Sequence, residues 1–228
     1  MSDTIRDQLL DAILPHVPFD GWSAAAFRAA IADLGMEKAV ADTACPRGAM
    51  DLAIAYHRRG DAAMVAAMKA SDMSEMRFRD KVAMALKLRV EALDNREAVR
   101  RASALFALPQ NSADGAKLIW ETADKVWTTL GDTSRDVNWY TKRATLSGVW
   151  ASTVLYWLGD ESPLATDTMD FIDRRIDNVM QIEKAKASLK KNPITKPFMS
   201  LKDSILSGVK APDKSRFANL PGNWKRPT

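Results

Sequence analysis

Residues 124–159, DKVWTTLGDTSRDVNWYTKRATLSGVWASTVLYWLG, decide the fold. Gly131 predicts the end of one helix, because glycine readily adopts the left-handed backbone that closes a helix C-terminus. Thr133 and Asp136 have the spacing of a capping box, so a second helix is expected to start there. Residues 144–159 carry no charge. A membrane span needs about 20 apolar residues, so this shorter run predicts a buried core helix.

The second helix is apolar on two sides. One face carries Tyr140, Ala144, Ser147, Ala151, Val154 and Leu158, and the other carries Trp139, Leu146, Trp150 and Trp157. Such a helix packs one face on a core and turns the other toward a ligand, a subunit or a second core layer. Trp139 stands apart, in the first turn and close to Arg143. The residues alone leave two interpretations open: a docking surface for a partner, or an aromatic lid supported by a cation–π contact with Arg143.

Helical spacing of apolar residues extends over most of the chain. Further helices are expected from Ile5 to Val17, in SAAAFRAAIADLG (capped by Ser23), in MEKAVADTA, around residues 47–70, 74–93, 96–108 and 118–130, and over 166–190. PQNSADG, residues 109–115, is expected to be a loop. No sequence repeat of fixed period is present, so the prediction is a single all-α bundle.

Residues 21–44 have the layout of a helix-turn-helix. Transcriptional repressors of the TetR type begin with this arrangement, so a ligand-responsive repressor is the alternative function. A DNA-reading helix needs cations beside the phosphates. Here Lys38 stands between Glu37 and Asp42, and the segment is net negative. Nucleic acid is therefore not expected as a partner.

No catalytic, metal or cofactor constellation is apparent. His16, His57 and the single Cys45 lack the spacing of a metal site, and no phosphate-binding glycine loop is present. The acids Glu121, Asp124, Asp132 and Asp136 are expected to cap helices and to be solvated at the surface. We therefore expect a binding protein without enzymatic activity, metal or cofactor.

The positive charge is concentrated at the C-terminus. Residues 181–228 carry eleven Lys and Arg against three Asp and Glu, whereas the preceding residues are net negative. The helical spacing of Phe198, Leu201, Lys202, Ile205 and Val209 predicts a basic amphipathic helix in a membrane interface. Docking of this helix on the protein itself is the alternative. The N-terminal residues resemble neither a secretory signal nor a transit peptide, so we expect a cytoplasmic protein attached to the inner face of a bacterial membrane.

The string W-x-x-x-G-D-x-S-x-D-x-N-W-Y-T-K-R, residues 127–143, and FIDRRIDNVM, residues 171–180, resemble the lipid-binding accessory proteins of ubiquinone (coenzyme Q) biosynthesis. GWSAAAFRAAIADLG and ALPQN also fit, and the resemblance covers most of residues 5–183. It implies a TetR-like fold, isoprenoid lipid held in the helical core, and partnership with the hydroxylase that acts on demethoxyubiquinone. The docking patch it implies consists of Trp127, Leu130, Asp136, Trp139 and Tyr140.

These observations predict three regions. Residues 1–60 form the helix-turn-helix-like segment, 61–190 the lipid-binding core and the dimerisation region of a homodimer, and 191–228 the basic amphipathic tail. The candidate lipid-binding residues are Leu118, Leu146, Trp150, Val154, Trp157 and Phe171. An isoprenoid quinone precursor or a phospholipid is the expected ligand. The protein is expected to extract it at the membrane and present the ring to the hydroxylase.

Overall fold

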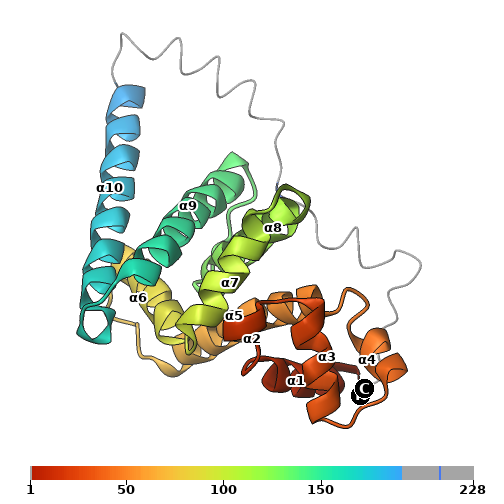
Figure 1. The fold of residues 1–228 in the computed structure, drawn as a ribbon. Coiled ribbons are helices and arrows are strands. Elements are labelled where there is room, and N and C mark those ends of the chain that lie inside the picture. The colour runs from red at the N-terminus through yellow and green to blue at the C-terminus, as the bar shows by residue number, and fades with distance from the viewer. Residues whose placement is uncertain (1, 192–210, 212–228) are drawn as a thin grey trace.

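The computed structural model describes residues 2–191 and residue 211, with side chains from 4 to 181 and at 211. The predicted tail residues Phe198, Leu201, Lys202, Ile205 and Val209 lie outside this part. Figure 1 shows helices joined by connecting segments, with no strand among the described residues, which confirms the expected all-α class. The helices are α1 (Ser2–Ile13), α2 (Val17–Asp20), α3 (Ala24–Asp33), α4 (Lys38–Ala44), α5 (Ala49–Ala70), α6 (Phe78–Glu91), α7 (Arg96–Ala107), α8 (Ser112–Thr129), α9 (Val137–Gly159) and α10 (Thr166–Lys191).

The first four helices gather at one end of the molecule (Figure 1). Helix α1 packs on α3, α4 and α5, and its Leu9, Leu10 and Ile13 are fully buried. The Ser23 hydroxyl accepts the Ala26 N–H at 3.2 Å, so the expected N-cap of α3 is confirmed. Helix α5 runs without a break through residues 60 and 61, and so links this end to the rest of the chain.

The larger part is built around α8 and α9. These two helices pack together, α5 lies against α8, and α10 covers α9 and α6 (Figure 1). Helix α9 carries the fully buried Trp150, as its apolar pattern predicts. None of the helices within the described residues is long and apolar enough to cross a bilayer.

Two sequence-based boundaries are wrong. Residues 109–115 are not a loop: a short 3₁₀ turn, Pro109–Asn111, leads directly into α8 at Ser112. The Asn111 amide donates to the Leu105 carbonyl at 3.0 Å and the Ser112 hydroxyl to Pro109 at 2.9 Å, so polar side chains stabilise a tight turn instead. Helix α9 is capped by Asp136, whose carboxylate accepts the Asn138 N–H at 3.0 Å, and not by Thr133.

Gly60 provides space inside the bundle. A Cβ at this position would lie 2.5 Å from Nη1 of Arg89. Glycine in a helix interior normally costs about 0.5–1 kcal/mol relative to alanine. We expect the opposite sign here: Gly60→Ala lowers the free energy of unfolding, because the buried guanidinium has to move.

Gly148 is the matched control, since a Cβ there would meet nothing within 4 Å. Gly148→Ala should stabilise the protein by about 0.5–1 kcal/mol. Urea denaturation measures both variants. Stabilisation by both substitutions would contradict the close approach of Arg89 to Gly60.

Candidate functional site

An apolar cavity of about 380 Å³ lies between α5, α7, α8 and α9. This volume falls in the roughly 300–1,000 Å³ range of small-molecule sites. Three of the predicted lipid-binding residues, Leu118, Trp150 and Val154, line it together. Leu93, Val99, Phe106 and Ile119 are among the other apolar side chains of its wall.

The other three predicted lipid-binding residues lie elsewhere. Leu146 lines a second cavity of about 270 Å³, between α6, α8, α9 and α10. Trp157 is buried beneath Arg96, whose guanidinium carbon is 4.6 Å from its ring centroid. Phe171 stacks on Tyr156 with ring centroids 4.4 Å apart. Of the six residues, the structure therefore unites three at one cavity and separates the rest.

One side of the first cavity is polar. His57 and Arg89 line it, and both belong to a network centred on Asp61, whose side chain is fully buried. Its carboxylate accepts hydrogen bonds from Arg89 Nε at 2.8 Å, Thr122 at 2.9 Å and Lys125 at 2.9 Å. His57 Nε2 lies 2.9 Å from the Thr122 hydroxyl. A charged cluster thus stands beside an otherwise apolar space.

The pKa values of this network follow from burial and charge. Burial lowers the pKa of His57 to about 4, against the attraction of Asp61. Burial would raise the pKa of Asp61, but His57, Arg89 and Lys125 outweigh it and hold the pKa below its ordinary value. At neutral pH the network therefore contains a neutral imidazole, one carboxylate and two cations.

His57 makes stability depend on pH. Its folded pKa, about 4, lies below the unfolded value of 6.5, so the unfolded chain takes up the proton first as the pH falls. The free energy of unfolding is therefore unaffected by His57 above pH 6.5, where the imidazole is neutral in both states. It falls by about 3 kcal/mol as the pH falls toward 4. Urea unfolding between pH 7 and pH 4 should show this loss in the wild type. His57→Gln should flatten it, and an unchanged slope in that variant would contradict the assignment.

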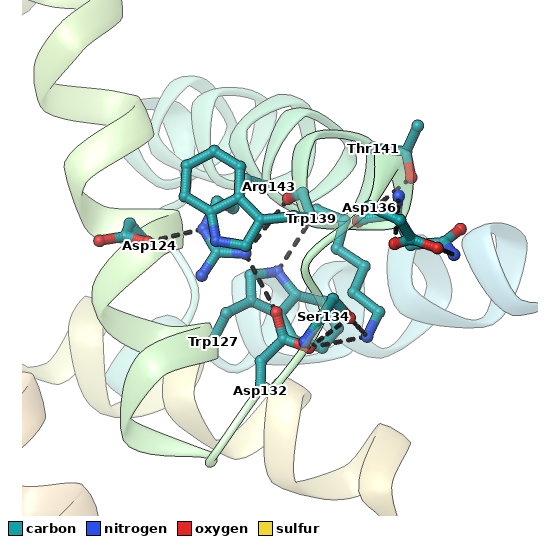
Figure 2. Close-up of polar contacts among 10 residues, drawn as sticks. Asp124, Trp127, Asp132, Ser134, Asp136, Trp139, Thr141 and Arg143 are labelled. Atoms are coloured by element: carbon teal, nitrogen blue, oxygen red, sulfur yellow. Dashed lines mark hydrogen bonds and ion pairs between the residues drawn. The ribbon is translucent and has the colours of Figure 1, made fainter. Parts of the chain in front are cut away.

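The turn between α8 and α9 is stabilised by Arg143, whose side chain is 2% exposed. Its Nε donates to Asp124 at 2.6 Å, and its Nη1 donates to Asp132 at 3.1 Å and to the Trp139 carbonyl at 3.1 Å. Figure 2 shows the guanidinium beneath the Trp139 ring, with its carbon 4.0 Å from the ring centroid. Arg143 therefore fixes both the turn and the indole.

Asp132 is the second centre of this turn, and its side chain is 3% exposed. Lys142 Nζ donates to it at 2.8 Å and the Ser134 hydroxyl at 2.8 Å. Burial would raise the pKa of Asp132, but the hydrogen bonds from Lys142, Ser134 and Arg143 outweigh burial and hold the pKa far below its ordinary value. The expectation that Asp132 is a solvated surface acid is wrong, because these two cations draw it inward.

The predicted docking residues surround this turn on two sides. Trp139 and Tyr140 are half-buried and form an edge-to-face pair with centroids 4.8 Å apart, and Trp120 packs on both. Trp127 stacks instead on Phe78, at 5.6 Å, and its indole N–H donates to the Lys142 carbonyl (Figure 2). Leu130 is half-buried and Asp136 is exposed. Trp139 thus has the cation–π support of a lid as well as a partly open face.

The remaining acids have ordinary partners. Asp136 caps α9 as expected, and Asp124 binds Arg143. Glu121 forms a bidentate ion pair with Arg58, with N–O distances of 2.8 and 2.9 Å. No group of His, Cys, Asp or Glu within the described residues could hold a metal ion.

Sequence reasoning missed the network around Asp61. One signal was available: Arg89 falls on the apolar stripe of residues 74–93, where a charged residue requires a buried partner. Nothing in the spacing of Asp61 or Lys125 identifies them as its partners.

Comparison with known proteins agrees with this architecture. The COQ9 family model matches residues 112–183, which include α8, α9 and the turn between them. The mitochondrial ubiquinone biosynthesis protein COQ9 of Rattus norvegicus is 29% identical over 192 residues, covering 79% of this chain and 60% of that protein. COQ9-B of Xenopus laevis is 30% identical, covering 78% and 64% respectively. The chain therefore spans about three fifths of the length of these relatives.

The fold is also that of a solved structure. A TetR transcriptional regulator from Nitrosomonas europaea superposes with a TM-score of 0.62, covering 75% of this chain and 95% of the regulator, at 17% identity. At that identity the likeness shows the fold alone. The matched segment and the curated relatives show that this chain is similar to the COQ9 proteins, and the shared architecture shows that its fold is TetR-like.

Proposed function

We propose that this chain serves ubiquinone biosynthesis as a non-catalytic accessory protein. It would bind an isoprenoid quinone intermediate and present its ring to the hydroxylase that acts on demethoxyubiquinone. The observation that carries this proposal is the apolar cavity of about 380 Å³ lined by Leu118, Trp150 and Val154. A substituted ring with its first isoprene units suits such a volume and lining.

The position of the cavity supports presentation to a partner. Helices α8 and α9 form part of its wall and also carry the turn with Trp139 and Tyr140. Aromatic side chains that are partly open and held rigidly are typical anchors of protein interfaces. A hydroxylase docked at this turn would therefore contact the same two helices that enclose the lipid.

The alternative, a ligand-responsive repressor, is less well supported. The likeness to a TetR regulator concerns the fold, and helix α4 has a poor surface for DNA. Lys38, its only cation, forms an ion pair with Asp42 in the same helix. Phosphates would meet a neutralised cation and the nearby Glu37. We therefore propose no nucleic acid partner.

We further propose a homodimer formed through α9 and α10. Helix α9 exposes Leu155, at 68%, which also lines the first cavity, and Tyr156, at 38%, which stacks on Phe171 of α10. Large apolar side chains that remain partly exposed are suited to contact a second copy. Sedimentation equilibrium distinguishes this dimer from a monomer.

Membrane attachment by the basic tail is also a proposal. Ala211, the one described residue beyond 191, donates its N–H to the Arg135 carbonyl at 3.0 Å, which places residue 211 at the turn between α8 and α9. We expect deletion of residues 196–228 to weaken binding to anionic vesicles without unfolding the bundle, because each Lys or Arg near such a surface contributes about 1 kcal/mol. Vesicle co-sedimentation measures this. Unchanged binding would contradict a membrane anchor at the inner face of a bacterial membrane, and would favour docking on the protein.

Reconstitution tests the accessory function. Purified hydroxylase is given demethoxyubiquinone in vesicles, with and without this chain. We expect the chain to accelerate hydroxylation and to show no turnover alone. An unchanged rate at saturating chain would overturn the proposal.

A further inference from the structure

Two buried hydrogen-bond donors at the cavity have no partner. Nη1 of Arg89 and Nε1 of Trp150 are fully covered and donate to no protein oxygen among the described residues. Both side chains line the 380 Å³ cavity, and the Arg89 guanidinium carbon lies 5.0 Å from the Trp150 ring centroid. A buried donor without a partner is unfavourable, so two such donors at one cavity require an explanation.

The surrounding network holds Arg89 in this position. Its Nε donates to Asp61 at 2.8 Å and its Nη2 to the His57 carbonyl at 3.0 Å, which leaves Nη1 as the spare donor. Gly60 leaves room for the guanidinium, since a Cβ there would overlap it. Replacing a buried ion pair with apolar side chains is often neutral or stabilising, so packing alone does not account for this arrangement.

We infer that Arg89 and Trp150 form the headgroup end of the cavity and donate hydrogen bonds to the oxygen atoms of a neutral ring, such as the carbonyl or methoxy oxygens of a quinone. The inference rests on the proposed lipid-binding function and adds its specificity-determining residues. The apolar lining then encloses the start of the isoprenoid chain. Both nitrogen atoms are covered, so entry of the oxygen requires the side chains over them to move aside.

The small number of spare donors favours a neutral headgroup over a phosphate. Arg89 and Lys125 are both bonded to Asp61, and His57 is neutral because burial lowers its pKa to about 4. Although Asp61, Arg89 and Lys125 together carry one net positive charge, a buried phosphate would need more hydrogen-bond donors than Arg89 Nη1 and Trp150 Nε1 to offset its loss of hydration. A neutral oxygen needs only the two free donors.

The test is titration calorimetry of the full chain with three probes that share a decyl chain: decylubiquinone, decylbenzene and decyl phosphate. We expect the wild type to bind decylubiquinone most tightly. Trp150→Phe keeps an aromatic ring but removes the N–H. It should lower the affinity for decylubiquinone roughly fivefold, as expected for the loss of one neutral hydrogen bond. The affinity for decylbenzene, which accepts no hydrogen bond, should fall less, because only the change in packing acts on it.

Arg89→Lys is the second variant, because it keeps a cation beside Asp61 and removes Nη1. It should lower the affinity for decylubiquinone at least about tenfold, as expected for the loss of a charged donor. Because Arg89→Lys can also unfold the protein, the result for Trp150→Phe decides whether the inference holds. An equal loss of affinity for decylubiquinone and decylbenzene in Trp150→Phe, or no loss of affinity, would overturn the inference. Tighter wild-type binding of decyl phosphate would overturn the neutral headgroup. If the wild type binds none of the probes, the proposed lipid-binding function itself fails.

Discussion

Trp150→Ala is expected to lower the free energy of unfolding by about 3–5 kcal/mol, the usual cost of truncating a buried tryptophan. The Trp150 side chain is 1% exposed and lines the apolar cavity. The same substitution enlarges that cavity and removes a wall of the proposed lipid site. We therefore expect a loss of bound lipid together with the loss of stability, measured by urea denaturation and by lipid content after purification.

Trp157→Ala is the matched control on the same helix. Trp157 is 6% exposed, and it packs beneath Arg96 rather than against either described cavity. Its truncation should cost a similar free energy but leave the lipid content of the folded protein unchanged. Equal lipid loss in both variants would show that lipid content follows stability and not the cavity wall.

Trp139→Ala is expected to weaken binding to the hydroxylase at least about thirtyfold, as expected for a hot-spot truncation of 2 kcal/mol or more. The stability loss should be smaller, about 1–2 kcal/mol, because the half-buried ring loses its contacts with Arg143, Trp120 and Tyr140. Co-purification with the hydroxylase and thermal melting of the same variant measure the two quantities. Asp136→Ala should act in the same direction but more weakly.

Trp157→Ala serves again as the control, because it destabilises α9 about 27 Å along the helix from Trp139. It should retain hydroxylase binding while folded. If Trp139→Ala instead shows the larger melting loss and binds the hydroxylase in proportion to its folded fraction, the aromatic turn is a lid and not a docking surface.

The elements that sequence alone predicts are those fixed by local interactions. Ser23 caps α3 and Gly131 follows α8, because caps and glycine turns depend on residues a few positions apart. Trp150 is buried, as the apolar pattern of α9 requires. Local reasoning placed the start of α9 incorrectly: Thr133 and Asp136 have suitable capping spacing, yet only Asp136 caps the helix.

The polar parts of both sites depend on distant partners, which local patterns do not reveal. Asp61 is 28 residues from Arg89 and 64 from Lys125, so only the packing of α5, α6 and α8 brings them together. Asp132 lies closer in sequence to Arg143, but its burial depends on how α8 and α9 pack. The lipid-binding set was divided for the same reason, because helical phase does not say which cavity a residue such as Leu146 faces.

Mass spectrometry of the lipids that co-purify with the native chain tests the central claim most directly. The account predicts an isoprenoid quinone or its ring-bearing precursor, bound by the wild type and by Trp157→Ala and depleted in Trp150→Ala. Recovery of bulk phospholipid alone, in equal amounts from all three proteins, would contradict it.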